Sequence, residues 1–483
     1  MKKLKTINGL LLVLGTFTLP GAAQAASLLE IYQQALQSDP QIHEAEARRL
    51  AALESKPQAR SVLLPQLSAS GEWSRVEPSG SSFEPSTGGT ISFDQSTDTT
   101  FWRIEMRQTL FRWDQVVNLR RADKDVARAE AVREAAQQDL IVRVAERYFG
   151  VLAAEDRLTS IHADRTAIAR QLEQAKQRFE VGLIAITDVQ ESQAAYDQSV
   201  ADEIAAKRSL ATAREFLREI TGEYVPALSA PGEDFPLMPP TPNDEASWVD
   251  LSMSQNLNLL ASRLDEKIAR DEIAFRRTGH YPSIDLVART SETTSDGDST
   301  ISRPGVPPLV PPTTTTEDID TTQDTDYIGI QVTVPIFSGG GTSSRVREAV
   351  YLHRAAREQL QRVTRETERQ ARDAYLGVVS ERSRVKALQQ AVQSSRTALE
   401  ATQAGFEVGT RTIVDVLNSQ FSLYLAITNY YQSRYDYVLN ALRLKQAAGN
   451  LAVQDLERID GVLRERKTPE DTIREEAAKD AES

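Results

Sequence analysis

One short stretch of this sequence occurs twice, at a constant distance along the chain. The residues Phe-Glu-Val-Gly at 179–182 recur at 406–409, so the offset is 406 − 179 = 227 residues. The same offset joins Tyr148 to Tyr375. A shift that is held without a gap over such a length predicts two structural repeats. We place the repeats at residues 26–240 and 241–460.

The first 25 residues are typical of a secretory signal peptide. A basic start with Lys2 and Lys3 precedes a short apolar run, and Ala23-Gln24-Ala25 forms a cleavage signal. The apolar run is too short to remain in a membrane as a spanning helix. We therefore expect residues 1–25 to be removed and the mature protein to lie outside the cytoplasm.

Charge and motif content exclude several classes of function. The formal net charge is −13, and removal of the three lysines of the signal peptide gives −13 − 3 = −16. An acidic chain without a basic patch argues against nucleic acid as a partner. Cysteine is absent, the four histidines have no ligand spacing, and no nucleophile motif or phosphate-binding loop occurs. We expect no catalytic residue, no cofactor and no metal site.

Each repeat is expected to contain a helix, two strands, a long helix, a turn and a return helix. The first repeat starts with a helix-favouring segment, residues 28–60. Strands are expected near 66–76 and 100–110 in the first repeat, and near 283–292 and 326–336 in the second. Two polar segments separate the strands, residues 78–98 and 293–324, and are interpreted as exposed loops.

The predicted strands alternate between apolar and polar side chains. This pattern fits a soluble sheet with one wet face, and it also fits the wall of a transmembrane β-barrel. The strands alone leave both possibilities open. In a barrel, the lipid would contact Trp102, Ile104, Ile330 and Val332, and the lumen would contact Arg103, Glu105 and Gln331.

The long helices favour the barrel interpretation. Apolar and small residues recur at alternating steps of three and four, which is typical of a coiled-coil seam. The seam of the first repeat comprises Leu158, Ile161, Arg165, Ile168, Leu172, Ala175 and Phe179, and that of the second comprises Val385, Leu388, Val392, Ser395, Leu399, Thr402 and Phe406. Residues 344–408 lack proline and would extend about 100 Å as one helix, which no compact domain needs.

Four strands cannot close a membrane barrel, because bacterial barrels contain at least eight. An open sheet edge in lipid leaves backbone groups without hydrogen bonds. The chain is therefore expected to share a barrel with copies of itself, and two, three or four copies would give about 8, 12 or 16 strands. The strand pattern does not choose among these numbers.

Glycines mark the turns of this arrangement. Gly182 and Gly409 are expected to end the long helices in the left-handed conformation, which places hairpin tips at 181–188 and 408–415. Thr187, Asp188 and Thr412 can help to start the return helices. The glycines at 339–341 are expected to form a flexible corner between strand and helix. Residues 461–483 are acidic and are expected to form a disordered tail.

Three motifs resemble the TolC family of outer-membrane efflux and secretion channels. RFEVGLIAITDVQ at 178–190 and FEVGTRTIVDVL at 406–417 are similar to the two periplasmic hairpin tips of that family, and VPIFSGGG at 334–341 is similar to its strand-to-helix junction. The resemblance implies an α+β membrane protein of the outer membrane. It also implies a homotrimer, in which a twelve-stranded β-barrel continues into a coiled-coil periplasmic tunnel.

The resemblance also implies partners and a mechanism. The duct would be passive and closed at rest. A periplasmic adaptor (membrane fusion) protein and an inner-membrane RND or ABC transporter would open its tip, and lipid of the outer membrane would surround the barrel. The adaptor would meet both tips, at Val181, Gly182, Leu183, Val408, Gly409 and Thr410, although these residues also suit plain turn geometry.

Two sets of residues would control the tip. The closed state would be held by Thr187 and Asp188 in the first hairpin and Arg411 in the second, where a guanidinium can bridge a hydroxyl and a carboxylate. The family often has tyrosine where this chain has Phe406, which has no hydroxyl to contribute. The resemblance places an aspartate ring at the tunnel entrance at Asp415. Asn418 occupies the position of a second ring, so we expect one ring of carboxylates.

Two other classes of function remain as alternatives to the duct. A soluble periplasmic coiled-coil scaffold or chaperone with a small sheet would also use long helices, in which case Asp188 would only cap a helix and Arg411 would be a solvated charge. An enzyme fits less well, because no catalytic constellation is present. The exported cargo is not encoded in these motifs, since the pump would select it.

Overall fold

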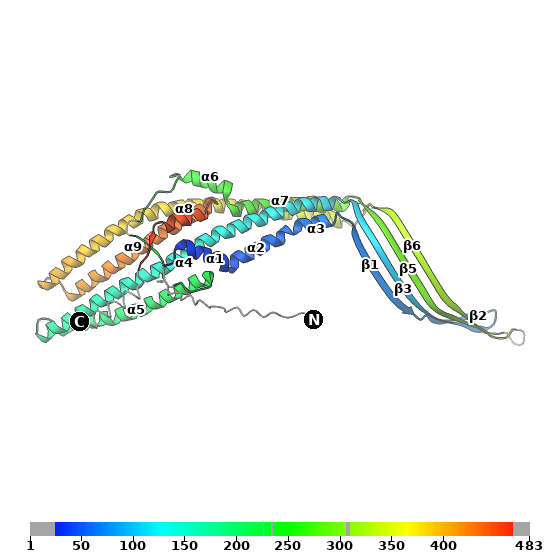
Figure 1. The fold of residues 1–483 in the computed structure, drawn as a ribbon, viewed down its shortest axis with the longest axis horizontal. Coiled ribbons are helices and arrows are strands. Elements are labelled where there is room, and N and C mark those ends of the chain that lie inside the picture. The colour runs from blue at the N-terminus through cyan, green and yellow to red at the C-terminus, as the bar shows by residue number, and fades with distance from the viewer. Residues whose placement is uncertain (1–24, 226, 233–234, 306–309, 467–483) are drawn as a thin grey trace, which may run out of the picture. The chain divides into compact units, whose positions relative to one another are not determined.

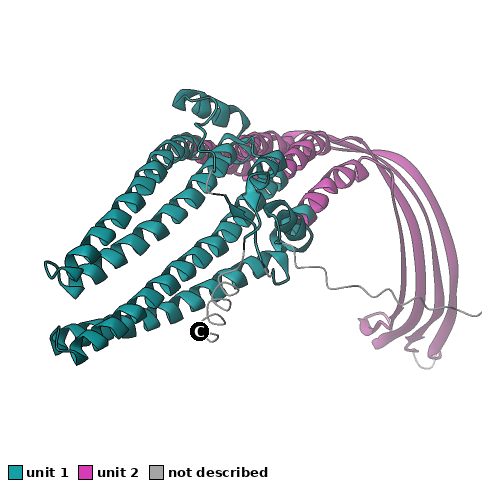
Figure 2. Cartoon of the chain, turned by 60° about the vertical axis from the view of Figure 1, so that its left-hand side comes forward, with its two compact units in different colours: residues 1–46, 132–260, 363–483 teal, residues 47–131, 261–362 magenta. Residues whose placement is uncertain are grey.

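The computed structural model describes residues 25–225, 227–232, 235–305 and 310–466. The expected signal peptide lies outside the described residues, apart from Ala25. The chain divides into two compact units (Figure 2). Unit 1 comprises residues 1–46, 132–260 and 363–483, and unit 2 comprises residues 47–131 and 261–362.

Unit 2 contains an antiparallel sheet of long strands (Figure 1). The strands are β1 (Gln66–Val76), β2 (Ser79–Glu84), β3 (Gly89–Phe111), β5 (Ser283–Arg303) and β6 (Thr313–Thr333). The order is β1-β3-β5-β6, and β2 pairs with the first part of β3. Within one chain, β1 and β6 therefore each have one edge without a neighbouring strand.

The two segments expected as exposed loops are strands instead. Residues 79–84 and 89–98 form β2 and the start of β3, while most of 293–324 extends β5 and begins β6. These stretches carry Ser, Thr and Asp on both faces, so no apolar alternation marks them in the sequence. Threonine nevertheless favours extended backbone, and the ladder supplies the hydrogen bonds. The strands expected near 100–110, 283–292 and 326–336 are correspondingly longer, and β6 ends at Thr333.

The single helix expected at 28–60 is divided into three. These are α1 (Leu28–Ser38), α2 (Pro40–Leu53) and α3 (Ser55–Ser61). Asp39 has φ −69° and ψ 117°, an extended conformation, because it precedes Pro40. Composition alone favoured one helix, whereas this local steric restriction breaks it.

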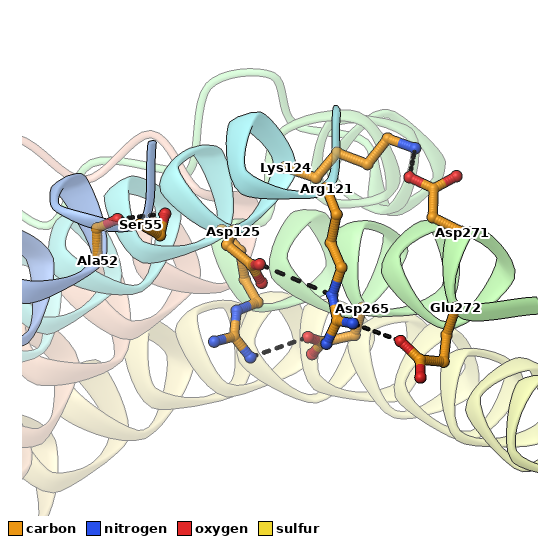
Figure 3. A network of polar contacts seen from close by, with 9 residues as sticks. Ala52, Ser55, Arg121, Lys124, Asp125, Asp265, Asp271 and Glu272 are labelled. Carbon is orange, nitrogen blue, oxygen red and sulfur yellow. Dashed lines mark hydrogen bonds and ion pairs between the residues drawn. The ribbon is translucent and has the colours of Figure 1, made fainter. Parts of the chain in front are cut away.

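Ion pairs connect helices within unit 2. The start of α4 (Trp113–Glu180) lies beside α7 (Leu257–Arg277), and Figure 3 shows the polar network between them. Arg121 pairs with Glu272, Lys124 with Asp271, and Arg128 with Asp265. The side chains are between about a fifth and a half exposed, so each pair adds little individually, but together they fix the register of the two helices.

Unit 1 contains two long helical hairpins. The first consists of α4, with 68 residues, and α5 (Ile186–Thr221), and the second of α8 (Gly341–Glu407), with 67 residues, and α9 (Ile413–Ala448). Their tips lie at the same end of unit 1 (Figures 1 and 2). In the described part of the chain, no helix has the length and apolarity that a membrane crossing requires.

Glycines with positive φ occur in pairs that are 227 residues apart. Gly182 and Gly409 have φ of 77° and 79°, and Gly222 and Gly449 have φ of 80° and 76°. The first pair lies in the two tips, and the second caps the two return helices in the left-handed conformation. Equal turns at equal spacing support the interpretation of two repeats.

The core of unit 1 surrounds two aromatic residues of α4. Tyr148 and Phe149 are fully buried, and the Phe149 ring stacks on Tyr435 of α9 with centroids 5.5 Å apart. The Tyr148 hydroxyl donates to the carbonyl of Ser229 at 2.6 Å. This packing joins α4 to α9 and to the segment before α6 (Glu245–Gln255). Because the phenol is bonded, its burial leaves no polar group unsatisfied.

The expected tail begins as ordered structure. After α10 (Val453–Asp460), β7 (Leu463–Arg464) pairs with β4 (Ala230–Pro231). Arg466 then forms an ion pair with Asp156, which is buried on α4. A buried carboxylate needs such a partner, and this partner is not apparent from the tail composition. Residues 467–483 lie outside the described part.

Candidate functional site

The first hairpin tip is a tight turn with exposed apolar side chains. The amide of Leu183 donates to the carbonyl of Arg178 at 2.8 Å, and that of Gly182 to the carbonyl of Phe179 at 2.9 Å. Val181 and Leu183 are 70% and 73% exposed. Large apolar side chains that project from a polar tip favour contact with another protein.

The return helix of this hairpin starts without a side-chain cap. Its N-cap is Ala185, so Thr187 and Asp188 lie inside the first turn of α5 instead of capping it. Asp188 still places a carboxylate near the positive end of the helix dipole. The predicted capping role of Thr187 is therefore wrong, and its exposed hydroxyl is available for other contacts.

The second tip repeats the turn but adds a cation. The amides of Thr410 and Arg411 both donate to the carbonyl of Gly405, at 2.8 and 3.2 Å. Val408 is 75% exposed. Thr412 caps α9, as predicted, and its hydroxyl accepts from the amide of Asp415 at 3.3 Å.

Asp415 completes a capping box with Thr412. The Asp415 carboxylate accepts from the Thr412 amide at 2.9 Å and from its hydroxyl at 3.0 Å. These bonds, the backbone one first, and the charge of Arg411 lower the pKa of Asp415. The carboxylate is therefore ionised at neutral pH, and Asn418 lies exposed at the next turn of α9. An entrance ring built from Asp415 would carry full charge.

Within one chain, the predicted latch residues are not joined. Among the described residues, no hydrogen bond or ion pair links Arg411 to Thr187 or to Asp188. Arg411 and Thr187 are exposed, and Asp188 is half-buried. A latch between them would therefore need a neighbouring copy of the chain.

Two contacts that the sequence did not predict join the hairpins of one chain. The guanidinium carbon of Arg178 lies 5.0 Å from the centroid of the Phe406 ring. Farther from the tip, Nε2 of Gln420 donates to Oδ1 of Asp164 at 2.8 Å and to its carbonyl at 3.2 Å. Burial raises the pKa of Asp164, although the bond from Gln420 opposes this shift. The only signals in the sequence were the position of Arg178 in the tip motif and the equivalence of Gln420 to Gln193.

A polar layer interrupts the seam of the first hairpin. Glu203 of α5 is 2% exposed and accepts from Arg165 at 2.6 Å and from Lys207 at 2.7 Å. Burial raises the pKa of Glu203, but hydrogen bonds and charge from the two cations outweigh it and lower the value to about 2. This pairing explains why an arginine stands in an otherwise apolar seam.

The strand register gives the sheet one apolar face. Leu286 pairs with Ile330, and Ile284 pairs with Val332. Directly paired residues in antiparallel strands point to the same side, and alternate residues do as well. The face thus also includes Trp102 and Ile104, while the opposite face carries Arg103, Glu105 and Gln331. The predicted grouping of these residues is confirmed by the register.

Farther along the strands, the apolar face becomes acidic. Asp98 pairs with Asp296, which in turn pairs with Asp320, so three carboxylates form one row across β3, β5 and β6. Arg75 balances one of them by donating two hydrogen bonds to Asp98, at 2.6 and 2.7 Å. Like charges opposite one another are destabilising unless water screens them. This part of the face therefore suits water, which limits the apolar belt to the strand ends nearer the helices.

Comparison with known proteins agrees with these features. The family model described as Outer membrane efflux protein matches residues 31–223 and 248–450. The outer membrane protein TolC of Vibrio cholerae is 36% identical over 449 residues, which is 92% of this chain and 96% of that protein. The alkaline protease secretion protein AprF of Pseudomonas aeruginosa is 29% identical over 453 residues, 92% of this chain and 89% of that protein.

The fold is shared with solved structures of the same kind. The crystal structure of the outer membrane protein VceC from Vibrio cholerae matches with a TM-score of 0.68 and 18% identity, over 87% of this chain and 96% of that chain. The relatives are channel and secretion proteins, so the soluble scaffold is disfavoured. Because the family model covers most of the sequence, the chain belongs to the outer membrane efflux protein family and forms an exit duct in the outer membrane.

Proposed function

We propose that three copies of the chain close one twelve-stranded barrel, which continues into a periplasmic tunnel of coiled coils. The open sheet carries the proposal, because β1 and β6 each lack a partner at one edge within the chain. Ile328 and Ile330, on the apolar face, are 77% and 64% exposed. Joining β6 of one copy to β1 of the next would satisfy the edges, and lipid would cover the apolar face.

The proposed duct is passive and works with two partners. A periplasmic adaptor would bind the exposed tip residues Val181, Leu183 and Val408, and an inner-membrane RND or ABC transporter would supply cargo and energy. The duct would serve a tripartite efflux pump, a type I secretion system, or both. We assign no enzymatic reaction to the chain, since the tips and the sheet hold no catalytic constellation among the described residues.

The closed state would depend on contacts between copies. Arg411 of one copy would reach Thr187 and Asp188 of the next, because its exposed guanidinium has no acceptor from those residues within its own chain. Asp415 would occur three times around the entrance and would attract cations. The lowered pKa of Asp415 supports this ring, since the carboxylates remain charged in spite of their proximity.

Resting conductance in planar bilayers tests the duct and its latch together. Purified wild-type protein should conduct weakly, and Arg411→Ser should conduct more while it still assembles, because a charge-assisted contact of about 1.5–3 kcal/mol is lost in each copy. Wild-type conductance in an assembled Arg411→Ser protein would reject the latch.

Crosslinking in cells tests the adaptor site. The chain has no cysteine, so Leu183→Cys introduces a single reactive thiol at the tip. It should crosslink to a periplasmic protein, whereas Val76→Cys, an exposed site on the sheet, should not. Equal crosslinking at both positions, or at neither, would contradict the proposed docking at the tips.

A further inference from the structure

Arg178 and Phe406 connect the two hairpins of one chain near their tips. Each lies in the last turn of a long helix, Arg178 in α4 and Phe406 in α8. The guanidinium carbon lies 5.0 Å from the ring centroid, a distance at which the cation is attracted by the negative face of the ring. A planar guanidinium can also stack on an aromatic ring. This contact needs no hydroxyl, so phenylalanine supports it fully.

The two halves of the sequence differ at this contact. The residue 227 positions after Arg178 is Gly405, since 405 − 178 = 227. A Cβ atom at Gly405 would lie 2.8 Å from Cγ of Arg411 and 3.2 Å from Oγ1 of Thr410. Glycine therefore leaves room for the stem of Arg411 against the end of α8. The first hairpin supplies a cation that reaches across, and the second provides space for a cation of its own.

A polar cavity separates the two contacts between the hairpins. Its volume is about 390 − 60 = 330 Å³, and its lining includes Arg170, Gln174, Arg178, Gln403, Phe406 and Gln420. Amides and guanidinium groups that face a cavity are readily hydrated and give little cohesion. The hairpins are thus joined at the Gln420–Asp164 bond on one side of the cavity and at Arg178–Phe406 nearer the tip. Loss of the second contact would leave the tip without a link between α4 and α8.

We propose that Arg178 and Phe406 form a clamp within each chain that holds α4 against α8 in the closed tip, and that Gly405 positions Arg411 for its contact with the next copy. The inference rests on the proposed function, because it adds positioning residues to the closed tip. The clamp takes the place of the hydroxyl that Phe406 lacks. Three copies of the clamp act on one entrance, so moderate contacts add up to a strong bias toward closure.

Resting conductance in planar bilayers tests the clamp. Arg178→Met and Phe406→Leu should each raise the open fraction about tenfold, since three cation–π contacts are lost at once. The double variant should conduct no more than either single variant, because both remove the same contact. Arg178→Lys and Phe406→Tyr should remain close to the wild type. Phe179→Leu is the matched control, since Phe179 occupies the equivalent position of the first hairpin.

A second variant tests the seat of Arg411. Gly405→Ala favours the helix but crowds Arg411, so it should raise resting conductance in the same way as Arg411→Ser. Combining Gly405→Ala with Arg411→Ser should add no further conductance. Wild-type conductance in Gly405→Ala would overturn the assignment of this glycine.

A distance measurement separates failure of the clamp from failure of the duct. Spin labels on Gln174→Cys and Gln403→Cys, in a chain without other cysteines, should give a narrow distance distribution that Arg178→Met broadens. Raised conductance in Arg411→Ser, with unchanged distances and conductance in Arg178→Met, overturns the clamp and keeps the duct. Broadened distances in Arg178→Met, with no conductance in any form of the protein, retain the clamp and reject the duct.

Discussion

Replacing Ile330 by arginine tests which face of the sheet meets lipid. Ile330 lies between Ile328 and Val332 on the apolar face, and its side chain is 64% exposed in the single chain. A lipid-facing arginine near the midplane costs about 2–4 kcal/mol. In the proposed trimer the change occurs three times, so the total is about 6–12 kcal/mol. Such a sum is comparable to the whole stability of many proteins, about 5–15 kcal/mol.

The adjacent residue provides the control. Gln331 points to the opposite face, where it pairs with Asp285, so Gln331→Arg should be tolerated. Outer-membrane extracts run unheated in SDS gels would show the assembled band for Gln331→Arg and little of it for Ile330→Arg. Equal assembly of the two variants would refute the assignment of the faces, and the reverse order would mean that the faces are exchanged.

Three further predictions follow from single contacts. Asp415→Asn keeps a capping acceptor but removes the charge, so block of the channel by multivalent cations from the periplasmic side should weaken on the order of tenfold, while Asn418→Asp should strengthen it; unchanged block in both would reject the ring. Asp164 has a raised pKa in the folded state, so the stability it contributes is present at low pH and is lost as pH rises through that pKa. Asp164→Asn should therefore raise the melting temperature at neutral pH and have no effect in acid, as followed by helical circular dichroism. Arg466→Met should lower the free energy of unfolding by about 1–3 kcal/mol, because Asp156 loses a partner, whereas the exposed Arg464→Met should have little effect in calorimetry.

The turns and the apolar belt could be predicted from sequence because each has a local cause. Gly182 and Gly409 adopt the left-handed conformation that ends a helix, and their equal spacing revealed both tips. Around Ile330, apolar and polar residues alternate with the period of a strand, which placed that residue on the correct face. Patterns of this kind survive without knowledge of the tertiary fold.

The polar parts of the strands could not be predicted in this way. Residues 313–326 carry Thr, Glu and Asp on both faces, so no periodic pattern distinguishes a strand from a loop, and the pairing with β5 decides the structure. The contact of Arg178 with Phe406 likewise depends on how two hairpins pack. A partner that is 228 residues away in the sequence, 406 − 178, leaves no local signal.

The central claim is that three chains share one barrel and one tunnel with a closed tip. Electron cryo-microscopy of the purified protein in lipid nanodiscs tests it most directly. The account predicts a threefold particle in which β6 of each chain pairs with β1 of the next, and in which the tips meet at Asp188 and Arg411 of neighbouring chains. A sheet that closes within one chain, a different number of copies, or tips that stand apart in the absence of a partner would contradict it.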